Sequence, residues 1–183
     1  MRNKVSLKLL PSFLFIIFLA IVPTLWFSSH VAKDLYYRQA RIELEKVSSI
    51  ISAEVVQHLS QKHLDDLGIY IEGLANETGQ RLTVVNMKGT VVFDSSEDFQ
   101  KMDNHAGRQE IHKALQGHAS QSIRYSNTLK KEMLYFAEPL LKDDIAIGVL
   151  RTSRAVNEIT ETLTLLYFKV TFLVLLLPYF AHF

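Results

Sequence analysis

The sequence predicts an α+β domain between two transmembrane helices, with a long N-terminal helix beside an antiparallel sheet of about five strands. The first observation is that 48% of the 183 residues are hydrophobic, with the excess in two nearly uncharged runs, residues 9–27 and 170–183. The second is the order of the periodic segments between these runs, which reads helix, helix, two strands, helix, three strands and an exit helix. One domain of about 130 residues accounts for this central part.

The composition argues against several function classes. The net charge of +1 and the lack of a basic stripe with interleaved aromatic residues give no reason to expect nucleic-acid binding. The absence of cysteine removes disulfides, thiolate metal sites and thiol nucleophiles. The sequence also shows no arrangement of nucleophile, base and orienting group. We therefore expect no enzymatic activity and no cofactor in this chain.

The N-terminal apolar run predicts a membrane anchor. Three cations among residues 1–8 precede residues 9–27, and a run of roughly 19 residues approaches the ~20 that a helix needs to cross the hydrocarbon core. Because cations stay on the cytoplasmic side, we expect residues 1–8 in the cytoplasm, a transmembrane helix at 9–28 and an extracytoplasmic domain after it. A cleaved signal peptide is the alternative, but its apolar region is typically shorter.

The C-terminal apolar run predicts a second transmembrane helix over residues 163–183, in which the ammonium group of Lys169 reaches the outer surface. A start at Val170 would leave only about 14 residues, too few for a complete crossing. No cytoplasmic flank follows in the sequence, so we expect this second helix to be truncated. The extracytoplasmic domain between the two helices is expected to span residues 29–162.

A long amphipathic helix is predicted to continue from the first membrane segment. Residues 31–59 contain no proline or glycine, and their apolar side chains recur at steps of three or four. This stripe suits either packing on the helix's own domain or contact with a second copy of the chain in a homodimer, and both alternatives stay open. The residues assigned to the dimer seam are Ala40, Leu44, Val47, Ile51 and Val55.

A second helix and a β-hairpin are predicted to follow. Apolar residues at helical spacing indicate a helix over residues 64–78, and Gly79 is placed to end it. Residues 82–86 and 90–94 read as two strands, and the short connection between them contains Gly89, where a positive φ is needed. These two strands are therefore expected to pair in an antiparallel hairpin.

The remaining elements are a short helix and three strands. The helix is predicted over residues 109–116, with Gly117 at its end. The strands are predicted at 120–125, 133–139 and 145–153, separated by polar turns. We expect the five strands to form one antiparallel sheet with the helices on one face, and such a sheet can enclose a small ligand.

The motifs along this domain resemble a known family. They are Arg81-Leu-Thr-Val-Val-Asn, Gly89-Thr-Val-Val-Phe-Asp94-Ser95, and Met102-Asp-Asn-His105 with Arg108 and Glu110, followed by Arg124, Ser126, Thr128, Met133, Tyr135, Ala137, Pro139, Gly148 and Arg151. Over about residues 31–159 the pattern resembles the extracytoplasmic PAS-like or single-Cache sensor domain of PhoR-like sensor histidine kinases. The resemblance implies a bacterial plasma-membrane protein whose central domain lies outside the membrane.

The resemblance also implies a function. Such a receptor is dimeric, responds to a small-molecule or protein signal, and passes a helix movement to a HAMP segment, a phosphoacceptor-histidine helix pair and an ATP-binding domain. The sequence contains no such kinase core. A cognate response regulator would be a partner only through that core. The alternatives are the sensor input of a chemoreceptor or cyclic-nucleotide enzyme, and a self-contained membrane-tethered binding protein.

Two arginines are the main candidates for ligand binding. Arg124 and Arg151 lie in or near adjacent predicted strands, and guanidinium groups on a concave sheet suit a carboxylate or phosphate-bearing ligand. The alternative is a solvated strand face, or structural ion pairs with Asp94 or Glu138. The sequence leaves both interpretations open.

Other residues complete the candidate site. Tyr135 and Ser126 are placed to extend such a pocket, and Asp94 ends a strand just before the irregular segment 97–107, which could close over the pocket as a lid. Arg108 lies near a helix start, where a capping or orienting role is the alternative. The candidate ligand-binding residues are Arg124, Ser126, Tyr135, Arg151, Asp94 and Arg108.

The histidines do not predict a metal site. The spacing of His105, His112 and His118 matches neither a helical two-histidine motif nor a cysteine-bearing site. An unperturbed imidazole titrates near pH 6.5, so protonation of one of these side chains in an acidic medium is a further hypothesis.

Overall fold

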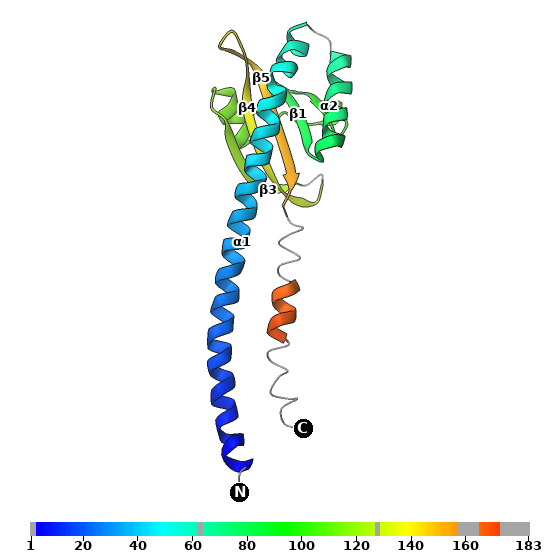
Figure 1. The fold of residues 1–183 in the computed structure, drawn as a ribbon. Coiled ribbons are helices and arrows are strands. Elements are labelled where there is room, and N and C mark those ends of the chain that lie inside the picture. The colour runs from blue at the N-terminus through cyan, green and yellow to red at the C-terminus, as the bar shows by residue number, and fades with distance from the viewer. Residues whose placement is uncertain (1–2, 62–63, 127–128, 157–164, 173–183) are drawn as a thin grey trace. The chain divides into compact units, whose positions relative to one another are not determined.

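A computed structural model describes residues 3–61, 64–126, 129–156 and 165–172 (Figure 1). Residues 37–156 form one compact unit, and the two ends of the chain belong to a second. Most of the predicted second transmembrane helix lies outside the described residues, although residues 165–172 are helical. The predicted domain boundaries at 28 and 162 therefore stay predictions.

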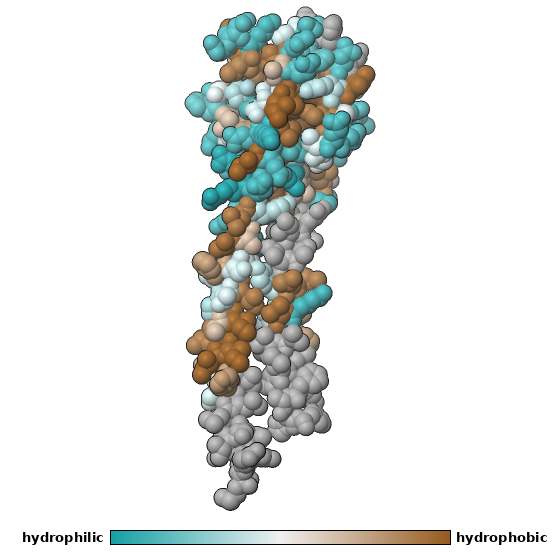
Figure 2. Space-filling model, in the orientation of Figure 1, coloured by the Kyte–Doolittle hydropathy of each residue, from teal (hydrophilic) through white to brown (hydrophobic). Residues whose placement is uncertain are grey.

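The first part of helix α1 (Asn3–Gln61) has the character of a membrane segment. Phe13, Phe15, Leu19 and Trp26 are each more than 60% exposed, and Figure 2 shows apolar residues in brown along this part of the helix. Within the described part of the chain, one helix is long and apolar enough to cross a membrane, and none of its most apolar stretch is buried. Apolar side chains that the protein itself does not cover are expected to be covered by lipid.

The central unit contains the predicted five-stranded antiparallel sheet. Its strands are β1 (Arg81–Asn86), β2 (Val91–Asp94), β3 (Ser120–Ser126), β4 (Lys131–Lys142) and β5 (Ile145–Ala155). The spatial order is β2-β1-β5-β4-β3, so the last strand in the chain occupies the centre. The predicted strands and their antiparallel arrangement are confirmed.

Two tight turns explain two of the hairpins. Gly89 has a φ of 81° in the turn from β1 to β2, a conformation that a residue without a Cβ adopts without strain. Asp143 and Asp144 have φ values of 51° and 61° in the two-residue turn from β4 to β5. Positive φ at both central positions is the property of the turns whose twist matches that of paired strands.

Helices α1 and α2 (Leu64–Thr78) cover one face of the sheet (Figure 1). Ile51 and Val55 of α1 and Ile71 of α2 are no more than 2% exposed. The other buried members of this core are Leu67, Leu82, Val84, Phe93, Leu140 and Leu150. Helix and sheet periodicity thus place the main hydrophobic core on this side of the sheet.

Helix α3 (Gln109–Leu115) packs against the opposite face. Its Ile111 and Ala114 form a second buried cluster with Val85, Ala137 and Val149. These strand residues alternate with the residues of the first core, as period-two alternation requires. The expectation that all helices lie on one face is therefore wrong, because the apolar stripe of α3 predicts burial but does not say against which face.

The predicted dimer seam belongs to the core of the domain. Ala40, Leu44, Ile51 and Val55 are at most 2% exposed within a single chain, and Val47 packs against the first core. The hydroxyl of Thr152 also donates a hydrogen bond to the carbonyl oxygen of Leu44. Because these side chains are already buried, the seam assignment is corrected to core packing, which was the alternative interpretation.

Candidate functional site

The half of the sheet face that α3 leaves uncovered forms the wall of a cavity. Three of the strand residues that line it are Arg81, Tyr135 and Arg151. Each lies an even number of positions along its strand from an apolar residue under α3, so its side chain is on the same face of the sheet. The cavity has a volume of about 320 Å³. Its lining residues are Arg81, Glu97, Asp98, Lys101, Met102, Asp103, His105, Arg108, Arg124, Ser126, Tyr135 and Arg151.

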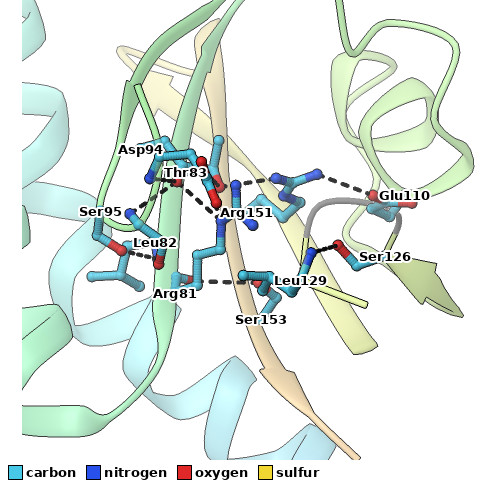
Figure 3. Close-up of polar contacts among 12 residues, drawn as sticks. Arg81, Leu82, Thr83, Asp94, Ser95, Glu110, Ser126, Leu129, Arg151 and Ser153 are labelled. Carbon is cyan, nitrogen blue, oxygen red and sulfur yellow. Dashed lines mark hydrogen bonds and ion pairs between the residues drawn. The ribbon is translucent and has the colours of Figure 1, made fainter. Parts of the chain in front are cut away.

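Arg151 on β5 lies at the centre of the polar network. Its side chain is 2% exposed, its Nη2 donates to the hydroxyl of Thr83 at 3.0 Å, and its Nη1 lies 3.6 Å from Oε1 of Glu110. Figure 3 shows the guanidinium group between these two residues. Burial lowers the pKa of Arg151 to about 10, against the opposing effect of Glu110, so the group carries its charge at neutral pH.

Glu110, in the first turn of α3, is the buried counter-charge of this network. Its side chain is fully buried, and it accepts a hydrogen bond of 2.6 Å from the hydroxyl of Ser122. Burial alone would raise its pKa, but the Ser122 hydrogen bond, a backbone hydrogen bond, Arg124 and Arg151 together lower it. Glu110 therefore stays ionised and holds both guanidinium groups on the cavity wall.

Tyr135 on β4 contacts both arginines through its ring. The Cζ atom of Arg124 lies 4.0 Å from the ring centroid, and that of Arg151 lies 4.9 Å from it. Cation–π attraction of this kind fixes the orientation of guanidinium groups without using their hydrogen-bond donors. The donors that do not already contact Thr83 or Glu110 accordingly stay available.

Several of these donors are buried and have no hydrogen-bond partner in the described part of the chain. They are Nε of Arg124 and both Nε and Nη1 of Arg151. A buried donor without an acceptor costs free energy, and such groups in a cavity often mark a place where a ligand supplies the acceptor. Acceptor atoms that carry negative charge match these cationic donors best.

Asp94 does not line the cavity. Both of its oxygens accept from Nε of Arg81 at 3.0 and 3.1 Å, and it also accepts from the Thr83 hydroxyl and from the backbone N–H groups of Ser96 and Glu97. With these contacts its acceptor capacity is used. We therefore correct the assignment of Asp94 from ligand binding to a structural role, in which it orients Arg81.

Arg108 is the N-cap residue of α3, but its side chain makes no capping hydrogen bond. The guanidinium group lines the cavity, and among the described residues none forms a hydrogen bond or ion pair with it. Burial and the neighbouring Arg124 lower its pKa, in that order. The structure thus favours a half-buried cationic donor at the cavity over the capping role.

The segment between β2 and α3 covers the cavity and is attached to the turn from β1 to β2. The backbone N–H of His105 donates to the carbonyl oxygen of Gly89 at 2.7 Å, and the amide of Asn104 donates to the carbonyl oxygen of Lys88 at 2.8 Å. A short 3₁₀ helix, η1 (Phe99–Lys101), lies within this segment. These two hydrogen bonds to the β1–β2 turn therefore fix the segment that was predicted to act as a lid.

The sequence-predicted residues come together except for one. Arg108, Arg124, Ser126, Tyr135 and Arg151 line the same cavity, although their role in binding stays a prediction. Ser126 also accepts a hydrogen bond from the N–H of Leu129. The sequence reasoning missed Arg81 and His105. Strand alternation from Val85 through Thr83 would have placed Arg81 on this face, whereas no local signal places His105 there.

Metal binding gains no support from the geometry. Within the described ranges, no group of three or more His, Cys, Asp or Glu side chains is placed to hold a metal ion. The nitrogen-rich wall of the cavity is also unsuited to a cation, because guanidinium groups cannot act as ligands.

Solved structures with the same fold are sensor domains. The chain resembles the sensor domain of the histidine kinase DctB from V. cholerae with a TM-score of 0.54, at 14% identity over 70% of this chain and 55% of that one. It resembles the sensor domain of DcuS from E. coli with a TM-score of 0.52, at 14% identity over 73% of this chain and 98% of that one. At such identities the similarity concerns the fold.

A third similar structure comes from a different class of protein. The domain of a sensory box/GGDEF family protein from Vibrio parahaemolyticus matches with a TM-score of 0.57, at 12% identity over 74% of this chain and 61% of that one. No curated protein sequence matches the chain. The single Cache-like family matches residues 27–154, which include the part of α1 in the central unit, α2, α3 and the sheet except for the last residue of β5. The chain therefore belongs to the single Cache-like family.

Proposed function

We propose that this chain is the signal-sensing input region of a receptor in the bacterial plasma membrane, and that its extracytoplasmic cavity binds a small carboxylate or phosphate ligand. The family and the shared fold with histidine-kinase sensor domains support the sensing role. The observation that carries the ligand class is the gathering of Arg108, Arg124 and Arg151 on one cavity wall, where buried donors of Arg124 and Arg151 have no hydrogen-bond partner among the described residues. An anion supplies the acceptors and the charge that these donors match.

The charges of the inner wall support an anionic ligand more strongly than the charges of all the lining residues taken together. Lys101 already pairs with Asp98 at 2.9 Å on the exposed rim, and Arg81 pairs with Asp94. Arg124 and Arg151 share the single buried carboxylate of Glu110. Arg108 adds a further cation that has no ion-pair partner among the described residues, so the inner wall carries more cationic than anionic charge, whereas Glu97 and Asp103 lie on the covering segment. An anion at the inner wall balances this local excess.

Removing the charge of Arg108 is expected to weaken anion binding by about tenfold or more, because a charge-assisted hydrogen bond is worth roughly 1.5–3 kcal/mol. The Arg108→Gln variant should keep the fold, since the parent guanidinium forms no hydrogen bond or ion pair with the described residues. The measurement is calorimetric titration of the chain in lipid nanodiscs with inorganic phosphate and with small mono-, di- and tricarboxylates.

The matched control is Arg41→Gln. Arg41 is half-exposed on α1 and pairs with Glu45 of the same helix, outside the cavity lining, so its loss should leave anion affinity unchanged. The proposal fails if the parent binds none of these anions at millimolar concentration. It fails equally if both variants lower the affinity by the same factor, because the loss would then reflect the net charge of the protein and not a contact in the cavity.

Strand β5 supplies a path from the cavity to the helix that leads to the membrane. Arg151 faces the cavity, and the next residue, Thr152, faces α1 and donates to the carbonyl oxygen of Leu44 at 3.2 Å. Arg154 forms an ion pair with Glu43 of α1. We infer that a ligand that displaces Arg151 shifts β5 relative to α1, which is the helix movement that the sensing role requires.

The Thr152→Val variant is expected to reduce this coupling while leaving anion affinity intact, because it removes the hydroxyl donor to α1 but no cavity atom. The chain has no cysteine, so spin labels can be attached specifically at Ser49→Cys on α1 and Leu141→Cys on β4. They report the distance between this helix and the sheet. Phosphate should shift that distance in the parent and shift it less in the variant. An equal shift in both, or none in the parent, would contradict the path.

The output region and the homodimer stay proposals. A histidine-kinase core outside this sequence is favoured by the DctB and DcuS folds, while a cyclic-nucleotide output is the alternative because a GGDEF-family protein shares the fold. A second copy would contact a surface other than the predicted seam, in which four residues are buried and Val47 is partly buried within one chain. The mass of the chain in nanodiscs, measured by light scattering, distinguishes one copy from two.

A further inference from the structure

We propose that His105 belongs to the anion site and takes up a proton when an anion binds in the cavity. This inference rests on the proposed anion-binding function and deepens it. His105 lines the cavity with Arg108, Arg124 and Arg151, and it is only 4% exposed. Its backbone is held by the hydrogen bond to Gly89. The imidazole therefore has a defined place beside the arginine donors.

The hydrogen bonds of the ring define its tautomer. Nδ1 lies 2.7 Å from the carbonyl oxygen of Asp103, and a carbonyl oxygen can only accept, so Nδ1 carries the hydrogen. The remaining nitrogen, Nε2, has no hydrogen-bond partner among the residues that the structure describes. In the neutral ring Nε2 is an acceptor. It becomes a donor only when the ring is protonated.

The surroundings keep the ring neutral without ligand. Burial first, and then Arg151, Arg108 and Arg124, lower the pKa of His105 to about 4, against the opposing effect of the hydrogen bond that the ring donates to the carbonyl oxygen of Asp103. An anion among these guanidinium groups offsets the repulsion that they exert on an imidazolium ion. The remaining charged groups around the site are Glu97, Asp98, Lys101 and Asp103 on the covering segment, Arg81 on β1 and Glu110 on α3.

Linkage then couples binding to pH. If the bound anion raises the imidazole pKa from about 4 back toward its ordinary value, the protonated ring adds a charge-assisted donor to the bound state at mildly acidic pH. Affinity for an anion that does not itself titrate is expected to rise about tenfold between about pH 7.5 and about pH 5. A site made of arginines alone would show no such dependence, because guanidinium groups stay charged throughout this range.

The experiment uses sulfate, which stays a dianion over this range, and the full chain in lipid nanodiscs. The dissociation constant is measured by calorimetry at about pH 7.5 and about pH 5 for the parent, for His105→Gln and for the control His118→Gln. His118 is exposed outside the cavity. We expect the parent and His118→Gln to bind sulfate about tenfold more tightly at the lower pH, and His105→Gln to bind equally at both.

A second measurement needs no variant. Titrations of the parent at about pH 5 in two buffers of different ionisation enthalpy count the protons taken up with sulfate, and a value approaching one proton is expected. Sulfate binding without proton uptake, or a pH dependence that persists in His105→Gln, overturns the role of His105 while the anion site stands. Absence of sulfate binding at both pH values overturns the anion site and this inference with it.

Discussion

Glu110→Gln is expected to destabilise the central domain by about 3 kcal/mol, because removing one partner of a buried ion pair leaves the other charge uncompensated. The carboxylate is fully buried and is the counter-charge of Arg151, which is 2% exposed. Glutamine preserves the size of the side chain and an acceptor for Ser122, so the loss is one of charge. Thermal unfolding of the chain in nanodiscs should show a fall in Tm of about 10 °C.

Glu72→Gln is the matched control for this prediction. Glu72 is exposed on α2, so the same chemical change there should alter the Tm by little. Equal stability of Glu110→Gln and the parent would show that Glu110 does not hold the arginines as the geometry indicates.

The destabilisation by Glu110→Gln should depend on pH. Burial raises the pKa of Glu110, but the Ser122 hydrogen bond and the other contacts outweigh burial, so that the folded-state pKa is lowered below the unfolded value. A lowered folded-state pKa stabilises the fold at pH values above the unfolded pKa, and this contribution is lost as the pH falls through the folded value. The difference in Tm between parent and variant is therefore expected to be full at neutral pH and to shrink in acid.

Gly89→Ala is expected to have a comparably large effect on stability and to weaken anion binding as well. A Cβ at this position would lie 2.4 Å from the Cβ of Ala106 and 2.7 Å from its backbone nitrogen. The φ of 81° adds strain for any side chain. We expect a loss of about 2–3 kcal/mol, since relief of the clash must displace the segment that carries His105 over the cavity.

Gly73→Ala serves as the control for Gly89→Ala. Gly73 lies in α2 with nothing within 4 Å of an added Cβ, so alanine should stabilise the helix by about 0.5–1 kcal/mol. Thermal unfolding and phosphate titration of both variants provide the comparison. If Gly89→Ala kept the parent's Tm and phosphate affinity, the covering segment would not depend on its attachment to the hairpin turn.

The sequence by itself determined the elements of this domain and their order. Residues 64–78 and the glycine at 79 define α2, and the connection around Gly89 defines the first hairpin, because helical periodicity, strand alternation and positive φ are local properties. The fold class followed from the order of these elements. The sequence also identified the five candidate residues that line one cavity. Arg124 and Arg151 were chosen by their charge and their place in or near strands, Ser126 and Tyr135 as extensions of the same pocket, and Arg108 by its place near a helix start.

The tertiary structure decided which surfaces those elements bury. The apolar stripe of α1 predicted burial, but only packing showed that Leu44 and Val55 face the domain's own sheet and not a second chain. Packing also placed α3 on the opposite face and brought His105, from a segment without periodicity, among three arginines. Periodicity identifies the face of an element that is buried, but its partner depends on contacts between residues far apart in the sequence, which no local pattern encodes.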